Sequence, residues 1–303
     1  MINMKYFFKY ISILVLVVIA LIYSCNKKAK DNQGAETIIS GKTAILVDES
    51  LLPIVEDQVA VFENQYDAKI KLLPESEKQL VMDFSKDKAK IAILSRELNA
   101  KEVAVFKQKK IVPRTTAFAI DALALINNKK SNDTLIDVDE LIKFIKGDKS
   151  DIKGLVFDNP NSSSVRYLCE IAKVSSLPEK GMYSFNTNEE VVKYVSENEG
   201  MIGVVGINWL FQPSLGSKQY IEKVNILSVK SSTTSGFVYP SQENIATRKY
   251  PLARVLYIIN CQGYEGLGMG FASFIAGEIG QRIVLTSGLA PMREPSHNIR
   301  IKN

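Results

Sequence analysis

The sequence predicts an α/β fold of two lobes, and three observations support this. From residue 42 onward, strand-like apolar runs alternate with segments of helical periodicity, which is typical of a parallel sheet with helices on its faces. The alternation occurs as two sets, one before and one after a long apolar segment at residues 117–126. A second long apolar run lies at residues 252–260, so we expect the chain to cross from one lobe to the other and back.

The elements expected in each lobe follow from periodicity and capping signals. Asn99 and Glu102 have the spacing of a capping box, and Gly147 is expected to end a helix. The expected strands are residues 43–47, 68–73, 91–94, 155–158 and 201–205. The expected helices are residues 51–66, 77–84, 103–108, 135–145, 162–173, 189–198 and 271–285. We assign lobe 1 to residues 42–120 and 254–303, and lobe 2 to residues 121–253.

The N-terminus has the pattern of a secretory signal with a lipidation site. Residues 1–10 carry two lysines and no acid, and residues 11–23 are apolar apart from Ser12, a run shorter than the roughly 20 residues of a membrane span. Ser24 and Cys25 follow. We expect cleavage after residue 24 and acyl chains on Cys25, with residues 25–41 as a flexible polar tether. An uncleaved membrane anchor is the alternative.

Composition excludes several classes of function. The net charge of +5 is spread over a chain of 303 residues without a basic stripe, so no nucleic-acid partner is expected. A single histidine, His297, argues against a histidine-based catalytic triad or metal site, and we expect no cofactor. Cys169 and Cys261 are compatible with a disulfide in an exported protein or with two unpaired buried cysteines.

Three loops follow strands and precede helices, where free amides favour anions. They lie at residues 48–51, 95–96 and 158–164, and the third contains consecutive serines at a helix start, with Arg166 in the first turn. Simple N-capping by Ser162 or Asn161 is the alternative interpretation of the serine cluster. Gly263, Gly266, Gly268 and Gly270 fit no nucleotide-binding motif and are interpreted as loop and close-packing residues.

The order of these segments resembles the periplasmic phosphate-binding protein of Pst-type ABC transporters over nearly the whole mature chain. Four segments carry the resemblance: ILSREL at 93–98, FAIDALA at 118–124, YPLAR at 250–254, and GQ at 280–281 with GLAP at 288–291. The resemblance implies a periplasmic-binding-protein-like (type II) fold, in which two lobes with mainly parallel sheets close on phosphate. It also implies a binding protein rather than an enzyme, with a membrane permease as partner.

The resemblance also assigns site residues by position. The family's Ser-Gly-Thr loop falls on Ser162, Ser163 and Ser164, and Asp121 is the candidate acceptor for a phosphate proton. The family's arginine about four residues before that loop is replaced by Asp158 or Asn159, so Arg96 or Arg166 is expected to supply the positive charge. The predicted ligand-binding residues are Ser50, Leu51, Ser95, Arg96, Asp121, Ser162, Ser163, Ser164 and Arg166.

The expected function combines the predicted lipid anchor with a predicted ligand site between the two lobes. We expect a lipid-anchored protein on the periplasmic side of the envelope that captures phosphate or a similar small oxyanion for an ABC-type transporter. The alternative keeps the fold but makes the protein an interaction or sensory lipoprotein of an envelope complex, with weak or no phosphate binding. Hydrolase activity at the serine cluster is disfavoured because the sequence shows no base near it.

Overall fold

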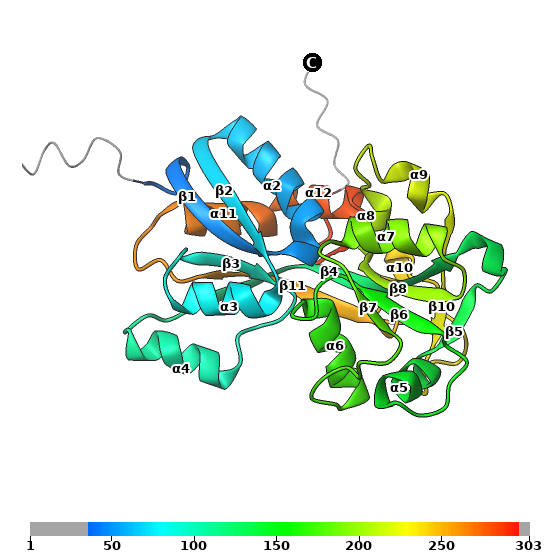
Figure 1. The fold of residues 1–303 in the computed structure, drawn as a ribbon. Helices are drawn as coiled ribbons and strands as arrows, with labels where there is room; N and C mark the ends of the chain where they lie inside the picture. The colour runs from blue at the N-terminus through cyan, green and yellow to red at the C-terminus, as the bar shows by residue number, and fades with distance from the viewer. Residues whose placement is uncertain (1–35, 297–303) are drawn as a thin grey trace, which may run out of the picture.

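The computed structural model describes residues 36–296, which form two α/β lobes joined by two strands (Figure 1). Within this range no helix combines the length and apolarity that crossing a membrane would require. The predicted signal at residues 1–24, Cys25 and His297 lie outside the described residues. The predicted domain boundaries remain predictions.

Lobe 1 is built on the sheet order β2-β1-β3-β11-β4, in which β1 is parallel to β2 and β3, and β11 is antiparallel to β3 and β4. Its strands are β1 (Ser40–Asp48), β2 (Asp67–Glu75), β3 (Ile91–Leu94), β11 (Ala253–Asn260) and the two-residue β12 (Ala290–Pro291). Its helices are η1 (Glu49–Leu51), α2 (Leu52–Gln65), α3 (Glu77–Ser85), α4 (Ala100–Gln108), α11 (Leu267–Ala276) and α12 (Glu278–Thr286).

Lobe 2 continues the same sheet through β4-β8-β6-β7, with β6 parallel to both β7 and β8. Its strands are β5 (Leu135–Asp137), β6 (Gly154–Phe157), β7 (Met182–Ser184), β8 (Met201–Gly206), β9 (Val224–Ile226) and β10 (Ser228–Lys230). Its helices are η2 (Lys129–Ser131), α5 (Val138–Lys146), α6 (Ser163–Ala172), α7 (Asn188–Glu197), α8 (Ile207–Phe211), α9 (Lys218–Ile221) and α10 (Gln242–Ala246).

Strand β4 (Arg114–Asn128) connects the lobes. Its first part, up to Ala122, pairs with β11, and from Leu123 onward it pairs with β8. All its residues from Phe118 to Asn128 are buried, which explains the long apolar segment in the sequence. Because one continuous strand belongs to the part of the sheet in each lobe, the loops at the inner ends of the other strands face each other across the junction (Figure 1).

The capping signals read from the sequence are confirmed. Asn99 accepts hydrogen bonds from the backbone of Lys101 and Glu102, and Glu102 accepts one from the Asn99 backbone, so both halves of the capping box are present. Gly147 ends α5 in the left-handed region at φ 81°. Ser162 caps α6 through a 3.3 Å hydrogen bond from the Val165 amide.

Two predicted elements differ from the structure. The helix expected at residues 271–285 is two helices, α11 and α12, separated by Gly277 in an extended conformation (φ −84°, ψ 177°). The bend brings Gly280 against the backbone of Ile275, where a side chain would not fit. The helix expected from residue 135 begins at Val138 because Leu135–Asp137 form β5, which pairs with β10, and Asp137 caps α5.

The glycine-rich segment and the cysteines have structural roles. Helix α11 begins at Leu267, so Gly268 and Gly270 lie within it and not in a loop before it. A methyl group on Gly270 would overlap the Ile38 carbonyl, which agrees with close packing at this glycine. Cys169 and Cys261 are free in the structure, so they do not form a disulfide with each other.

Candidate functional site

Two serine hydroxyls from opposite lobes meet at the centre of the junction. Ser50 lies in η1, directly after β1, and Ser163 is the first residue of α6; both are fully buried. Their Oγ atoms are 3.1 Å apart. The Ser50 hydroxyl and amide both donate to Asp48 Oδ1, at 3.0 and 3.1 Å. The two hydroxyls also form a hydrogen bond with each other across the junction.

One guanidinium group holds both hydroxyls. Arg254, on the crossover strand β11, donates from its terminal nitrogens to Ser163 Oγ at 2.9 Å and to Ser50 Oγ at 3.0 Å. Its Nε donates to Asp121 Oδ2 at 2.9 Å, and Asp121 is the residue directly opposite in the register of β11 and β4. Only 4% of Arg254 is exposed. A buried arginine from the crossover thus joins lobe 1, lobe 2 and the strand that connects them.

Carboxyl groups surround this guanidinium. Asp48 and Asp158 are each 1% exposed, and Glu49 is partly buried. Burial raises the pKa of Asp48, although Arg254 opposes the shift. Burial also raises the pKa of Asp158 to about 6, and the charge of Asp48 adds to the shift. Burial, followed by the charge of Asp158, raises the pKa of Glu49 to about 8. These buried carboxyl groups therefore release their protons at a higher pH than exposed carboxyl groups would.

The start of α6 presents hydrogen-bond donors to the same region. Ser163 and Ser164 follow the capping residue Ser162, and their amides belong to the first turn, where backbone donors lack intrahelical partners. Ser164 is fully buried, and its Oγ has no hydrogen-bond partner among the described residues. Across the junction, the Trp209 indole donates to the Ser50 carbonyl at 3.0 Å, so α8 also contacts the first loop.

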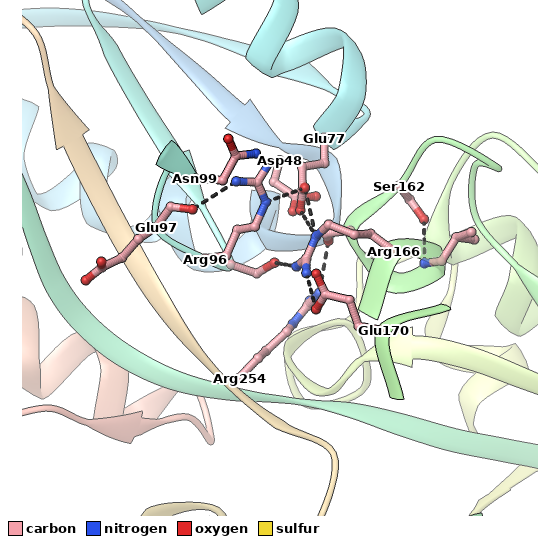
Figure 2. A network of polar contacts seen from close by, with 12 residues as sticks. Asp48, Glu77, Arg96, Glu97, Asn99, Ser162, Arg166, Glu170 and Arg254 are labelled. Carbon is pink, nitrogen blue, oxygen red and sulfur yellow. Dashed lines mark hydrogen bonds and ion pairs between the residues drawn. The ribbon is translucent and has the colours of Figure 1, made fainter. Parts of the chain in front are cut away.

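A second polar cluster lies beside the first and also joins the lobes (Figure 2). Glu77, at the start of α3, is 3% exposed and receives Arg96 Nε and Arg166 Nε, each 2.8 Å from its Oε1. Arg96 also pairs with Glu102, and Arg166 with Glu170. Arg166 donates to Ser95 Oγ at 3.4 Å. Because Glu77 belongs to lobe 1 and Arg166 to lobe 2, this cluster is an interlobe ion pair.

The structure divides the predicted site residues into two groups. It brings Ser50, Asp121 and Ser163 together around Arg254, with Ser164 and Leu51 adjacent in the chain. Leu51 is fully buried in the apolar core, so only its backbone is available to a ligand. Arg96 and Arg166 both contact Glu77, Arg166 also contacts Ser95, and Ser162 caps α6. Ligand binding by any of them remains a prediction.

Arg254 is the main residue that sequence reasoning missed. The expected positive charge was assigned to Arg96 or Arg166, yet these side chains are paired with Glu77. The signal for Arg254 was present, since it is the only charged residue in the apolar run at residues 252–260. A charge in such a buried strand requires a partner, and Asp121 is the only charged residue in the other crossover segment, at residues 117–126.

Two lobes, two connecting strands and polar loops facing each other across the junction define the periplasmic-binding-protein-like class, as the sequence predicted. A family model described as the PBP superfamily domain matches residues 32–278, and the chain belongs to this family. Within the described residues there is no group of three or more histidine, cysteine, aspartate or glutamate side chains arranged to hold a metal ion.

Individual relatives share both length and fold. The phosphate-binding protein PstS of Borreliella burgdorferi is 27% identical over 303 residues, covering 92% of this chain and 97% of the relative. A structure from Clostridium perfringens, assigned as a phosphate ABC transporter substrate-binding protein with bound phosphate, has a TM-score of 0.69 at 19% identity, covering 84% of this chain and 100% of that one. An ABC-type phosphate transport receptor from Vibrio cholerae has a TM-score of 0.61 at 18% identity, covering 83% and 100%. These names describe binding proteins and not enzymes.

Proposed function

We propose that this protein binds phosphate, or a similar small oxyanion, between its lobes and delivers it to an ABC-type transporter. The observation that carries the proposal is the contact of Arg254 with Ser50 and Ser163, which come from opposite lobes. An anion held by this guanidinium lies within reach of donors on both sides. The names of the three relatives described above refer to phosphate binding or phosphate transport, which agrees with this ligand.

The chemistry of the site supports a protonated oxyanion in particular. The serine hydroxyls and the first amides of α6 donate to oxygen atoms that lack protons. Asp48 Oδ2 is buried without a hydrogen-bond partner among the described residues, and an ionised carboxylate only accepts. Phosphate near neutral pH carries at least one proton to donate, whereas sulfate carries none. We therefore propose Asp48, together with Asp121 as first predicted, as the carboxyl groups that favour phosphate over sulfate.

Ligand entry requires the two serine hydroxyls to separate. Ser50 and Ser163 are in direct contact at 3.1 Å, and Trp209 also bonds across the junction to Ser50. A ligand that binds between the loops separates the two hydroxyls. Each hydroxyl then contacts an oxygen atom of the ligand and no longer contacts the other hydroxyl. The arginine then remains on Asp121 while its terminal nitrogens turn from the serines to the anion.

We further propose that the protein is anchored through lipid on Cys25 on the periplasmic side of the envelope. The support is the signal pattern at residues 1–24 followed by cysteine. An anchor raises the effective concentration of the binding protein beside a membrane permease. Cys25→Ser in the full chain is expected to move the protein from the membrane fraction to the soluble fraction and to abolish labelling by a fatty-acid analogue. Unchanged labelling of the variant would exclude Cys25 as the acylated residue.

A second candidate function is favoured by the charge at the junction. Asp48, Asp121 and Asp158 surround a single arginine, and Glu49 lies beside Asp158, which is a surplus of carboxyl groups for an anion site. An interaction or sensory lipoprotein with the same fold needs no anion there. Titration of the protein with phosphate and with sulfate separates the two candidates, because the sensory candidate predicts weak or no phosphate binding, without the tight binding and the preference over sulfate that a phosphate receptor requires.

A further inference from the structure

Two carboxyl groups from opposite lobes converge on one amide group beside the site. Asn188 Nδ2 donates to Glu49 Oε2 at 2.9 Å and to Asp158 Oδ2 at 3.3 Å. Glu49 belongs to η1 of lobe 1, whereas Asp158 follows β6 and Asn188 begins α7, both in lobe 2. We call Glu49, Asn188 and Asp158 the carboxyl clasp.

The orientation of the amide is fixed by a third contact. Asn188 Oδ1 accepts a hydrogen bond from the Gly206 amide at 3.2 Å, and Asn188 is fully buried. Turning the amide over would place its NH2 group against the Gly206 donor and its oxygen against two carboxyl groups. The NH2 group therefore faces the carboxyl groups, and it donates one hydrogen bond to Glu49 of lobe 1 and one to Asp158 of lobe 2.

The Asn188 amide is the one side-chain donor that Glu49 and Asp158 share, and it does not satisfy all four of their oxygens. Glu49 Oε1 and Asp158 Oδ1 are buried and have no hydrogen-bond partner among the described residues. Two carboxylates that share one amide repel each other, and a proton on one of them removes the repulsion and adds a donor. This geometry favours a clasp that carries a proton.

The charged groups around the clasp do not remove its preference for a bound proton. From the elements packed against the clasp, the charged groups that act on it are Asp48 at the end of β1 and Arg254 on β11. Asp48 raises the pKa of both members, and Arg254 lowers that of Asp158 but is already paired with Asp121. Burial, the largest cause, and Asp158, the next, bring the pKa of Glu49 from an ordinary 4.5 to about 8.

We propose that closing of the two lobes takes up a proton at the carboxyl clasp, so that acidic conditions favour the closed protein and basic conditions favour the open one. Separation of the lobes removes Asp158 from Glu49 and exposes both groups to water. The inference concerns the protein without ligand and does not depend on which ion it binds. It assigns a regulatory role to Glu49, Asn188 and Asp158 beyond ligand capture.

The direction of the pH effect on lobe closure, and the pH range in which it occurs, follow from the linkage between proton binding and closing. Glu49 is a stronger base in the closed protein, so closing binds a proton at pH values between its ordinary pKa of 4.5 and its closed-state pKa of about 8. The closing equilibrium is most favourable below this range, falls by up to about tenfold for each pH unit within it, and is constant above it. Asp158 contributes in the same direction at lower pH, up to about 6.

The experiment follows lobe closure without any ligand. The chain that begins at Asn26 keeps every described element, and Trp209 is the only tryptophan in the sequence. The Trp209 indole bonds across the junction to Ser50, so its fluorescence reports closure, and small-angle X-ray scattering measures the overall dimension independently. Both are recorded in phosphate-free buffer between about pH 5 and 9, with circular dichroism to verify folding.

The expected result is a transition to a larger radius of gyration and red-shifted fluorescence as pH rises. Glu49→Gln, which stays neutral, is expected to remain compact over the whole range, and Asp158→Asn is expected to lower the amplitude. Glu243→Gln, on an exposed residue of α10, serves as the control and should behave as the unmodified protein. Dimensions and fluorescence that do not change with pH, or an unaltered transition in Glu49→Gln, would overturn the proposal.

Discussion

Arg254 and Asp121 face each other on neighbouring antiparallel strands, with the guanidinium Nε 2.9 Å from the carboxylate Oδ2. Both strands run between the lobes, and both side chains are buried. The pair therefore has two roles. Each side chain neutralises the buried charge of the other. The contact with Asp121 also orients the terminal guanidinium nitrogens of Arg254 toward the serines of the two lobes.

The first prediction concerns the stability of this pair. Arg254→Met leaves the Asp121 carboxylate buried without its partner, and the expected loss in the free energy of unfolding is about 3–5 kcal/mol. Arg254→Met combined with Asp121→Leu removes both charges and should recover most of the loss. Urea denaturation of the two variants measures the difference. Equal destabilisation of the single and double variants would contradict the role of the pair.

The second prediction concerns the junction serines. Ser163→Ala removes a hydroxyl that contacts both Arg254 and Ser50, so phosphate affinity should fall by about tenfold, equivalent to about 1.4 kcal/mol. Ser176→Ala, at an exposed position after α6, is the matched control and should keep the original affinity. Isothermal titration calorimetry gives both values. An identical affinity in Ser163→Ala and the control would remove Ser163 from the proposed site.

The third prediction concerns the interlobe ion pair. Glu77 holds Arg166 across the junction, and Glu77→Gln should weaken lobe closure because two arginines lose their shared partner. Glu170→Gln is the control, since Glu170 also pairs with Arg166 but lies on the same helix. Small-angle scattering at about pH 5 should show a larger radius of gyration for Glu77→Gln only. The same radius in both variants would show that Glu77 does not hold the lobes together.

The fourth prediction concerns the bend between α11 and α12. A Cβ atom on Gly280 would lie 2.4 Å from the Ile275 Cα and 2.5 Å from the Phe274 carbonyl, both of which are backbone atoms. Gly280→Ala should therefore cost about 1–3 kcal/mol of unfolding free energy. Gly216→Ala, where the nearest atom lies 3.8 Å away, is the control. Thermal denaturation compares the two, and an undiminished stability of Gly280→Ala would contradict the packing.

Local signals in the sequence predicted the fold well. The capping box at Asn99 and the glycine at residue 147 act within one turn of chain, so their spacing alone identifies helix ends. The split at Gly277 was missed because the apolar periodicity continues through it, and only packing of Gly280 on Ile275 requires the bend. β5 was missed because a three-residue strand depends on its partner β10, which lies far along the chain.

The candidate site was predicted only in part, because some of its contacts join residues that are far apart in the sequence. Ser50 and Ser163 could be placed near a ligand because loops after parallel strands gather at one edge of a sheet. The contact of Arg254 with Asp121 depends on the register of two strands that are more than a hundred residues apart, which no local pattern encodes. Arg96 and Arg166 were favoured because they lie in the predicted loops, yet Glu77, at the start of α3, attracts both.

The most direct test of the central claim is calorimetric titration with phosphate and sulfate of the chain that begins at Asn26. We predict saturable binding of phosphate near one ion per protein, clear preference over sulfate, and loss of binding in the Arg254→Met, Asp121→Leu variant. The double variant is used because it removes the guanidinium together with Asp121, the carboxylate with which it is paired. Absence of saturable phosphate binding by the folded, unmodified protein, or equal binding by the double variant, would contradict the account.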